Sequence, residues 1–141
     1  MLDKDVTEAL FEEAQKASEA SYSPYSQFPV GAALLLASGE IIHGCNVENA
    51  SFGLTICAER TALVSWIAQA KQADAIVAIA VYGAKTPHHH ITPCGACRQS
   101  LVEFCGEDTV LVFRDAQGVL VQKPVVDFLP DRFELADSSN K

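Results

Sequence analysis

Three cysteines in two short segments constrain this chain most. Cys57 precedes Glu59 by two residues, and Cys94 and Cys97 enclose a Gly-Ala pair. Two thiols at that spacing, with a third from elsewhere in the chain, can occupy three corners of a tetrahedron around Zn²⁺. The fourth corner then stays free for water, which distinguishes a catalytic zinc from a structural one. Glu59 is suitably placed to move the protons of that water.

The composition is that of a compact, acidic, single-domain protein. The chain has 141 residues, of which 49% are hydrophobic and 20% charged, enough for one buried core. Ten Lys and Arg residues are outnumbered by 18 Asp and Glu residues, so the formal net charge is −8. Proteins that bind nucleic acid usually present a concentrated basic face. This balance therefore disfavours nucleic acid and favours a small-molecule partner.

The N-terminus and the cysteine content predict a cytoplasmic location. The chain begins with the charged residues Asp3, Lys4 and Asp5 and lacks the apolar stretch of a secretory signal. The longest apolar run, residues 30–37, is far shorter than the roughly 20 residues that a membrane span needs. Five cysteines without a secretory signal favour free thiols or metal ligands over disulfides.

Periodicity and turn residues predict a layered α/β domain with a mixed sheet. Helices are expected at 5–21, 57–70, 94–104 and 124–129, and strands at 28–36, 40–46, 76–82, 109–113 and 118–122. Val6 and Leu10 are core candidates of the first helix, and Val64 and Trp66 of the second. We expect a single catalytic domain over 1–136, followed by a disordered tail at 137–141.

Each cysteine segment is predicted to begin a helix, where unpaired N–H groups and the macrodipole favour thiolate over thiol. Cys94 and Cys97 face the same side of one turn and can share an ion. Three thiolates leave the zinc site with a net charge of −1, so a cation should contact the sulfurs. Arg60 is the first candidate donor and Arg98 the second, although both could make surface ion pairs instead. Glu59 could likewise be only a favourable charge in the first helical turn.

Four segments together resemble the small, homotetrameric class of cytidine deaminase. They are residues 25–31, 46–51, 57–62 and 93–99, in the order of that family, and the similarity covers about residues 5–135. The zinc deaminases use His or Cys as the third ligand, and this chain has the all-cysteine version. The resemblance implies a three-layer α/β/α fold with a mixed five-stranded sheet and one Zn²⁺ per chain. It also implies deamination of cytidine and 2′-deoxycytidine to uridine and 2′-deoxyuridine, in pyrimidine salvage.

The same resemblance assigns roles to individual residues. A zinc-activated water would attack C4 of the pyrimidine, with Glu59 moving protons from that water to N3 and to the departing ammonia. The backbone N–H of Ala58 would bind the carbonyl O2 of the base. Asn46 and Glu48 would hydrogen-bond the ribose, mainly its 3′-hydroxyl, and Phe28 would stack near the base. Phe28 could alternatively be an ordinary core residue of a strand.

The family shares each site between subunits of a homotetramer. Ala50 and Phe52 in the segment 49–52, together with Phe133, match the positions that contact a neighbouring site. Many relatives have tyrosine where this chain has Phe52, so any hydroxyl contact there is absent. Asp131 and Arg132 replace the small residues that usually precede the C-terminal aromatic residue.

Other cysteines and histidines admit simpler interpretations. The run His88-His89-His90 could bind transition metals weakly, but we interpret it as a solvated loop because the zinc site already has its ligands. Cys45 and Cys105 are interpreted as small buried hydrophobic residues.

Two alternatives lie outside the deaminases and two within them. Cys94 and Cys97 at a helix start could form a thioredoxin-type dithiol, which leaves Cys57 and Glu59 unexplained. A structural zinc would close its fourth corner with another cysteine or a histidine. A blasticidin S deaminase shares the zinc motifs but departs from the Asn-x-Glu segment that this chain keeps. Nucleotide deaminases mostly use histidine as first ligand and need cations for phosphate. Cys57 and the net charge of −8 therefore disfavour this alternative.

Overall fold

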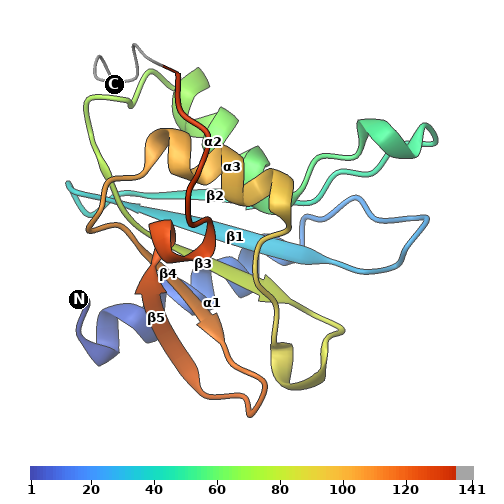
Figure 1. The fold of residues 1–141 in the computed structure, drawn as a ribbon. Helices are drawn as coiled ribbons and strands as arrows, with labels where there is room; N and C mark the ends of the chain where they lie inside the picture. Colours follow the sequence, from blue (N-terminus) through green and yellow to red (C-terminus); the bar gives the residue numbers. More distant parts are fainter. Residues whose placement is uncertain (136–141) are drawn as a thin grey trace.

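A five-stranded mixed sheet forms the centre of the computed structural model, which describes residues 1–135 (Figure 1). The strands lie in the order β2-β1-β3-β4-β5, and only β3 and β4 are parallel neighbours. Their bounds are Val30–Leu36 for β1, Ile41–Cys45 for β2, Ile76–Gly83 for β3, Val110–Arg114 for β4 and Leu120–Pro124 for β5. These five strands and the mixed sheet agree with the sequence-based prediction.

Helices cover both faces of the sheet, which confirms the three-layer α/β/α architecture. Helix α1 (Lys4–Ser18) packs on one face, whereas α2 (Ala58–Ala68) and α3 (Gly95–Phe104) lie side by side on the other (Figure 1). The buried cluster under α1 contains several alanines together with Phe11 and Tyr82, while the cluster under α2 and α3 has more residues. The strand β3 contributes to both layers because its side chains alternate between the faces.

Helix α1 ends three residues earlier than predicted. It begins at an Asp3 cap, whose carboxylate accepts from Val6 N at 2.9 Å, and it ends at Ser18. Its predicted last turn is lost because Tyr22 pairs with the strand-like residue Val47 in an isolated bridge. The bridge bonds, from Tyr22 N to Asn46 O at 3.0 Å and from Glu48 N to Tyr22 O at 2.8 Å, require extended backbone there.

Two predicted core positions are wrong. Val6 and Val64 are 37% and 59% exposed. The buried stripe of α2 consists of Ala58, Ala62, Leu63 and Trp66, so Val64 falls on the opposite side of that helix.

Close approach of helix and sheet depends on a glycine under the first turn of α2. A Cβ on Gly44 would lie 2.3 Å from Ala58 O and 2.5 Å from Ala62 N. Only glycine therefore lets the start of α2 lie directly against β2. Because Cys57 caps this helix, the glycine also determines how deep that sulfur lies.

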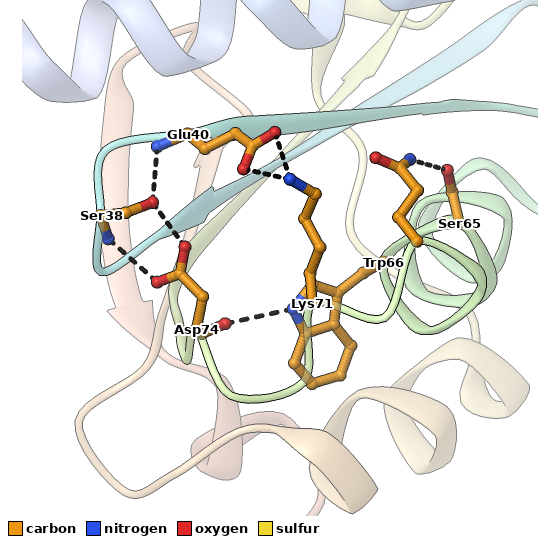
Figure 2. A network of polar contacts seen from close by, with 7 residues as sticks. Ser38, Glu40, Ser65, Trp66, Lys71 and Asp74 are labelled. Atoms are coloured by element: carbon orange, nitrogen blue, oxygen red, sulfur yellow. Dashed lines mark hydrogen bonds and ion pairs between the residues drawn. The ribbon is translucent and has the colours of Figure 1, made fainter.

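The opposite end of α2 is held by a polar network to the β1–β2 hairpin (Figure 2). Trp66 Nε1 donates to Asp74 O at 3.1 Å, and the Asp74 carboxylate accepts from the Ser38 N–H at 3.0 Å. Lys71 Nζ lies 2.7 Å from a carboxylate oxygen of Glu40. Both ends of the helix that carries Cys57 and Glu59 are thus attached to the same hairpin.

Three short 3₁₀ helices complete the described chain: η1 (Phe52–Leu54), η2 (Pro87–His89) and η3 (Val125–Phe128). The last takes the place of the short helix predicted at 124–129, and η2 lies in the predicted loop 83–92. None of the helices in residues 1–135 is both long and apolar enough to cross a membrane. The predicted tail at 137–141 lies outside the described residues.

Candidate metal centre and active site

The structure brings the three sulfurs together at two adjacent helix starts. Cys57 is the N-cap of α2, Cys94 is the N-cap of α3, and Cys97 lies in the first turn of α3. Their Sγ atoms all lie within 4.8 Å of one another. A tetrahedral zinc with Zn–S bonds of about 2.3 Å separates its sulfurs by about 3.8 Å, so this cluster fits the ion. Among residues 1–135, no fourth Cys, His, Asp or Glu joins the group.

The surroundings of the cluster favour thiolate. Arg60 Nη2 donates to Cys57 Sγ at 3.4 Å. A hydrogen bond from Cys97, followed by the contact with Arg60, lowers the pKa of Cys57 to about 5. The same hydrogen bond to Cys57 raises the pKa of Cys97. Cys57 and Cys97 thus lie within hydrogen-bond contact of each other, a separation that also suits two ligands of one cation.

Glu59 is buried beside the sulfurs. Its side chain is only 4% exposed, although it belongs to the first turn of α2. Burial raises the pKa of this carboxyl, and its contact with Cys97 partly opposes the shift. A merely dipole-compensating glutamate would reach solvent, whereas this one faces the sulfur cluster. A buried carboxyl with a raised pKa is suited to exchanging protons near neutral pH.

Arg98 does not contact sulfur, contrary to the expectation that it is a second donor. Its Nε donates to Pro93 O at 2.8 Å, its Nη1 to Phe128 O at 3.1 Å and its Nη2 to Thr92 Oγ1 at 3.3 Å. Arg98 follows Cys97 directly, so it is rotated about 100° around α3 from that ligand.

Asn46 is held within the scaffold that carries Phe28. Its Nδ2 donates to Phe28 O at 2.8 Å, and its Oδ1 accepts from Val30 N at 3.0 Å and from the Ser21 hydroxyl. Nδ2 thus uses one of its two protons in these bonds. Phe28 lies just before β1 rather than in it, and its half-buried ring packs against the core below α2 and α3. The structure therefore supports a packing role for Phe28 and leaves part of its ring accessible.

Glu48 is oriented by Tyr25 and Ser26, for which the sequence predicted no individual role. Its Oε1 accepts from Tyr25 N at 2.9 Å and from Ser26 N at 3.1 Å, and its Oε2 accepts from the Ser26 hydroxyl. These bonds, with the Ser26 hydroxyl first, lower the pKa of Glu48, so it is a carboxylate at neutral pH. Ser26 Oγ also accepts from Phe28 N at 3.1 Å. The only sequence signal for Ser26 was its place beside Phe28 in the segment 25–31.

A hollow of about 280 Å³ adjoins Glu48. It is lined by Tyr25, Ser26, Glu48, Phe52 and Thr55. The ring of Phe52 contacts that of Tyr25, with centroids 5.6 Å apart. Ala50 is exposed, and Phe52 and Phe133 are 72% and 69% exposed, so this single chain does not enclose these three residues.

The histidine run is tied to the fold more than a solvated loop would be. His89 stacks on Tyr82 with ring centroids 4.8 Å apart, and its Nδ1 lies 3.1 Å from Gly83 O. His90 Nδ1 lies 2.7 Å from Arg114 O. His88 is exposed, as expected for a solvated residue. Of the two remaining cysteines, Cys105 packs against the core and Cys45 is half-buried.

The fold has three α/β/α layers, and three thiols meet at two helix starts beside a buried glutamate. This combination defines a zinc enzyme of the hydrolytic type. A family model for the zinc-binding region of cytidine and deoxycytidylate deaminases matches residues 4–113. The chain belongs to this family, and zinc is its metal.

Relatives of known name agree over most of the chain. A cytidine deaminase of Halalkalibacterium halodurans is 43% identical over 131 residues, which is 93% of this chain and 96% of the relative. The crystal structure of a cytidine deaminase from Burkholderia pseudomallei superposes with a TM-score of 0.78 at 47% identity. That similarity covers 89% of this chain and 98% of the other. A blasticidin-S deaminase of Bacillus cereus is less similar, at 30% identity over 74% of this chain and 76% of the relative.

Proposed function

We propose that this chain catalyses the zinc-dependent hydrolytic deamination of cytidine and 2′-deoxycytidine to uridine and 2′-deoxyuridine, with release of ammonia. The observation that carries the proposal is the cluster of three cysteine sulfurs within 4.8 Å of one another, with the buried Glu59 in contact with it. Membership of the deaminase family supports the same reaction. We further propose that the reaction serves pyrimidine salvage in the cytoplasm.

Glu59 is proposed as the group that moves protons. Zinc, when bound, supplies a Lewis acid that lowers the pKa of a water molecule toward 7. The Glu59 carboxylate would accept a proton from the attacking water and deliver it to N3 of the base. It would then take the proton of the new C4 hydroxyl and deliver it to the amino group, which leaves as ammonia. Water is added at C4, the C4–N4 bond breaks, and uridine and ammonia result. Burial supports this role, since it raises the pKa of Glu59 and so helps the carboxyl to hold a proton.

The substrate is proposed to lie between the sulfur cluster and the hollow beside Glu48. The backbone N–H of Ala58 lies in the first turn of α2, where helical N–H groups have no partner within the helix, so it can donate to O2 of the base. The ionised Glu48 and the second amide proton of Asn46 suit ribose hydroxyls. Phe28 is proposed to contact the base with the accessible part of its ring.

A blasticidin S deaminase is the second candidate within the family. The relative of that name is 30% identical to this chain, compared with 43% for the cytidine deaminase of Halalkalibacterium halodurans. Asn46 and Glu48 are both present here and are held in place by Ser21 and Ser26. A preorganised amide and carboxylate favour a nucleoside with free sugar hydroxyls.

The test is to follow the ultraviolet absorbance of cytidine, 2′-deoxycytidine, cytidine monophosphate and blasticidin S in separate reactions. We expect loss of the cytosine band with both nucleosides, at a kcat/KM at least about 100-fold higher than with the monophosphate, since each unpaired buried phosphate charge is costly. Turnover of the monophosphate or blasticidin S alone would contradict the proposed substrate.

We also propose that the enzyme is a homotetramer in which Ala50, Phe52 and Phe133 contact a neighbouring site. The exposed apolar side chains around Phe52 support an interface, because large exposed apolar patches commonly mark protein contacts. Leu54 is 65% and Ile56 40% exposed, beside the 72% exposed Phe52.

Sedimentation velocity tests this assembly. We expect a mass of about four times the 15.1 kDa of one chain for the wild type. Leu54→Arg should yield smaller species and lose activity in parallel, because a charge buried in an interface is costly. Val119→Arg is the control, since Val119 is similarly exposed (56%) but lies beside the β4–β5 turn. A monomeric, fully active wild type would refute shared sites.

A further inference from the structure

We propose that Arg98 is a positioning residue for zinc binding. It restrains the backbone on both sides of the ligand Cys94 and couples this ligand to the 3₁₀ helix η3, without touching any sulfur. The inference depends on the three-cysteine zinc site and concerns how tightly that site holds its ion.

Cys94 is the least supported of the three ligands. Cys97 is completely buried within α3, and Cys57 is half-buried with its sulfur hydrogen-bonded to Arg60. Cys94 is exposed, its side chain makes no capping hydrogen bond, and it follows the long connection from β3. Packing alone therefore does little to restrict its backbone, and ordering it on metal binding would cost conformational entropy.

Arg98 restrains both peptide groups that flank Cys94. Its backbone N–H donates to Cys94 O at 2.9 Å, and its Nε donates to Pro93 O at 2.8 Å. These two carbonyls belong to the peptide units after and before Cys94, so together they restrain both backbone dihedral angles of the cysteine. Nη2 adds a bond to Thr92 Oγ1, one residue further back.

The rest of the guanidinium is anchored on a separate segment. Nη1 donates to Phe128 O at 3.1 Å, and the guanidinium carbon lies 5.3 Å from the centre of the Phe128 ring. Three nitrogens of one rigid fork thus join α3, the segment before Cys94 and η3. Lysine cannot reproduce this arrangement, because its ammonium is a single point charge on a flexible stem. Substitution of residues that orient metal ligands commonly lowers metal affinity by 10- to 100-fold.

The test is the rate of zinc release from purified holoenzyme to an excess of a chromophoric chelator, with no substrate present. We expect Arg98→Gln to release zinc at least about 10-fold faster than the wild type, and Arg98→Lys to be intermediate. Thr92→Val removes the acceptor of the 3.3 Å bond and should accelerate release about two- to threefold, as expected for the loss of one long hydrogen bond. KM for cytidine should change little in the fraction that retains zinc.

Arg114→Gln is the matched control. Arg114 also donates to a carbonyl, Gly118 O at 2.8 Å, and lies over an aromatic ring, that of Phe11 at 4.9 Å. It belongs to β4 and faces the α1 layer, so its loss should lower thermal stability without accelerating zinc release. Equal acceleration in both variants would reduce Arg98 to a general contributor to stability and overturn the proposal.

The outcomes separate this inference from the zinc assignment itself. If Cys94→Ser retains zinc as tightly as the wild type, the ligand assignment fails. If Cys94→Ser loses zinc but Arg98→Gln releases it at the wild-type rate, only the positioning role fails. Should Arg98→Gln not fold, wild-type release rates in both Arg98→Lys and Thr92→Val would overturn the proposal.

Discussion

Glu59→Gln should lower kcat for cytidine by about 10²- to 10⁴-fold while the protein keeps one zinc per chain. Glutamine has nearly the same shape and can still hydrogen-bond, but it cannot accept and return a proton. Glu59 is 4% exposed and is not one of the clustered ligands, so the substitution leaves the three sulfurs intact. The measurement combines steady-state kinetics with zinc analysis of the same preparation.

Two further variants sharpen this experiment. Glu59→Asp keeps a carboxylate but withdraws it by one methylene, so we expect activity between those of the wild type and Glu59→Gln. Glu12→Gln is the control, because Glu12 is an exposed residue of α1 and its change should leave kcat unaltered. Wild-type turnover by Glu59→Gln with full zinc content would eliminate Glu59 as the proton carrier.

Local sequence pattern predicts much of the metal centre because its parts are local. Helix starts at residues 57 and 94 follow from the apolar periodicity after each cysteine, and the spacing of Cys94 and Cys97 already indicates a shared ion. The meeting of these two segments is a tertiary property, and it was anticipated through the number of ligands that zinc requires. The order of strands in the sheet, by contrast, was not predicted and is known only from the structure.

The supporting residues could not be predicted from residue type alone. Arg60 and Arg98 each follow a ligand closely, yet only Arg60 contacts sulfur. The spacing from the preceding cysteine distinguishes the two arginines. Arg60 is three residues after the helix-capping Cys57 and lies on the same face, whereas Arg98 is one residue after Cys97 and points elsewhere. Ser26 is less accessible to such reasoning, because its contact with Glu48 joins residues 22 positions apart.

The errors in α1 and α2 have the same cause: they depend on contacts between distant segments, which local sequence does not show. Val6 and Val64 are apolar and in helices, but burial depends on which side of the helix meets the sheet. The early end of α1 depends on the pairing of Tyr22 with Val47, a contact between distant segments. Helical propensity cannot anticipate that competition, because extended pairing satisfies the same backbone groups.

Cys97→Ser should remove zinc and abolish measurable deamination. Cys97 is completely buried within the sulfur cluster, and a serine hydroxyl is a poor zinc ligand at neutral pH. Zinc-binding energies of about 10 to 16 kcal/mol in four-ligand sites correspond to about 3 kcal/mol per ligand. We therefore expect at least about 100-fold weaker zinc binding, measured by competition with a chelator of known affinity.

Cys105→Ser is the matched control, since it makes the same replacement at the other end of α3. Burial raises the pKa of Cys105 to about 12, so this thiol stays protonated at neutral pH and does not act as a ligand. Its substitution should lower stability modestly and leave zinc content unchanged, because Cys105 packs against the core and is not part of the sulfur cluster. Zinc added to chelator-treated wild type or Cys105→Ser should raise the melting temperature, because an ion that binds only the folded state stabilises it. Cys97→Ser should show no such rise; a full rise in that variant would mean that zinc is held without the buried sulfur, and the proposed reaction would lose its metal centre.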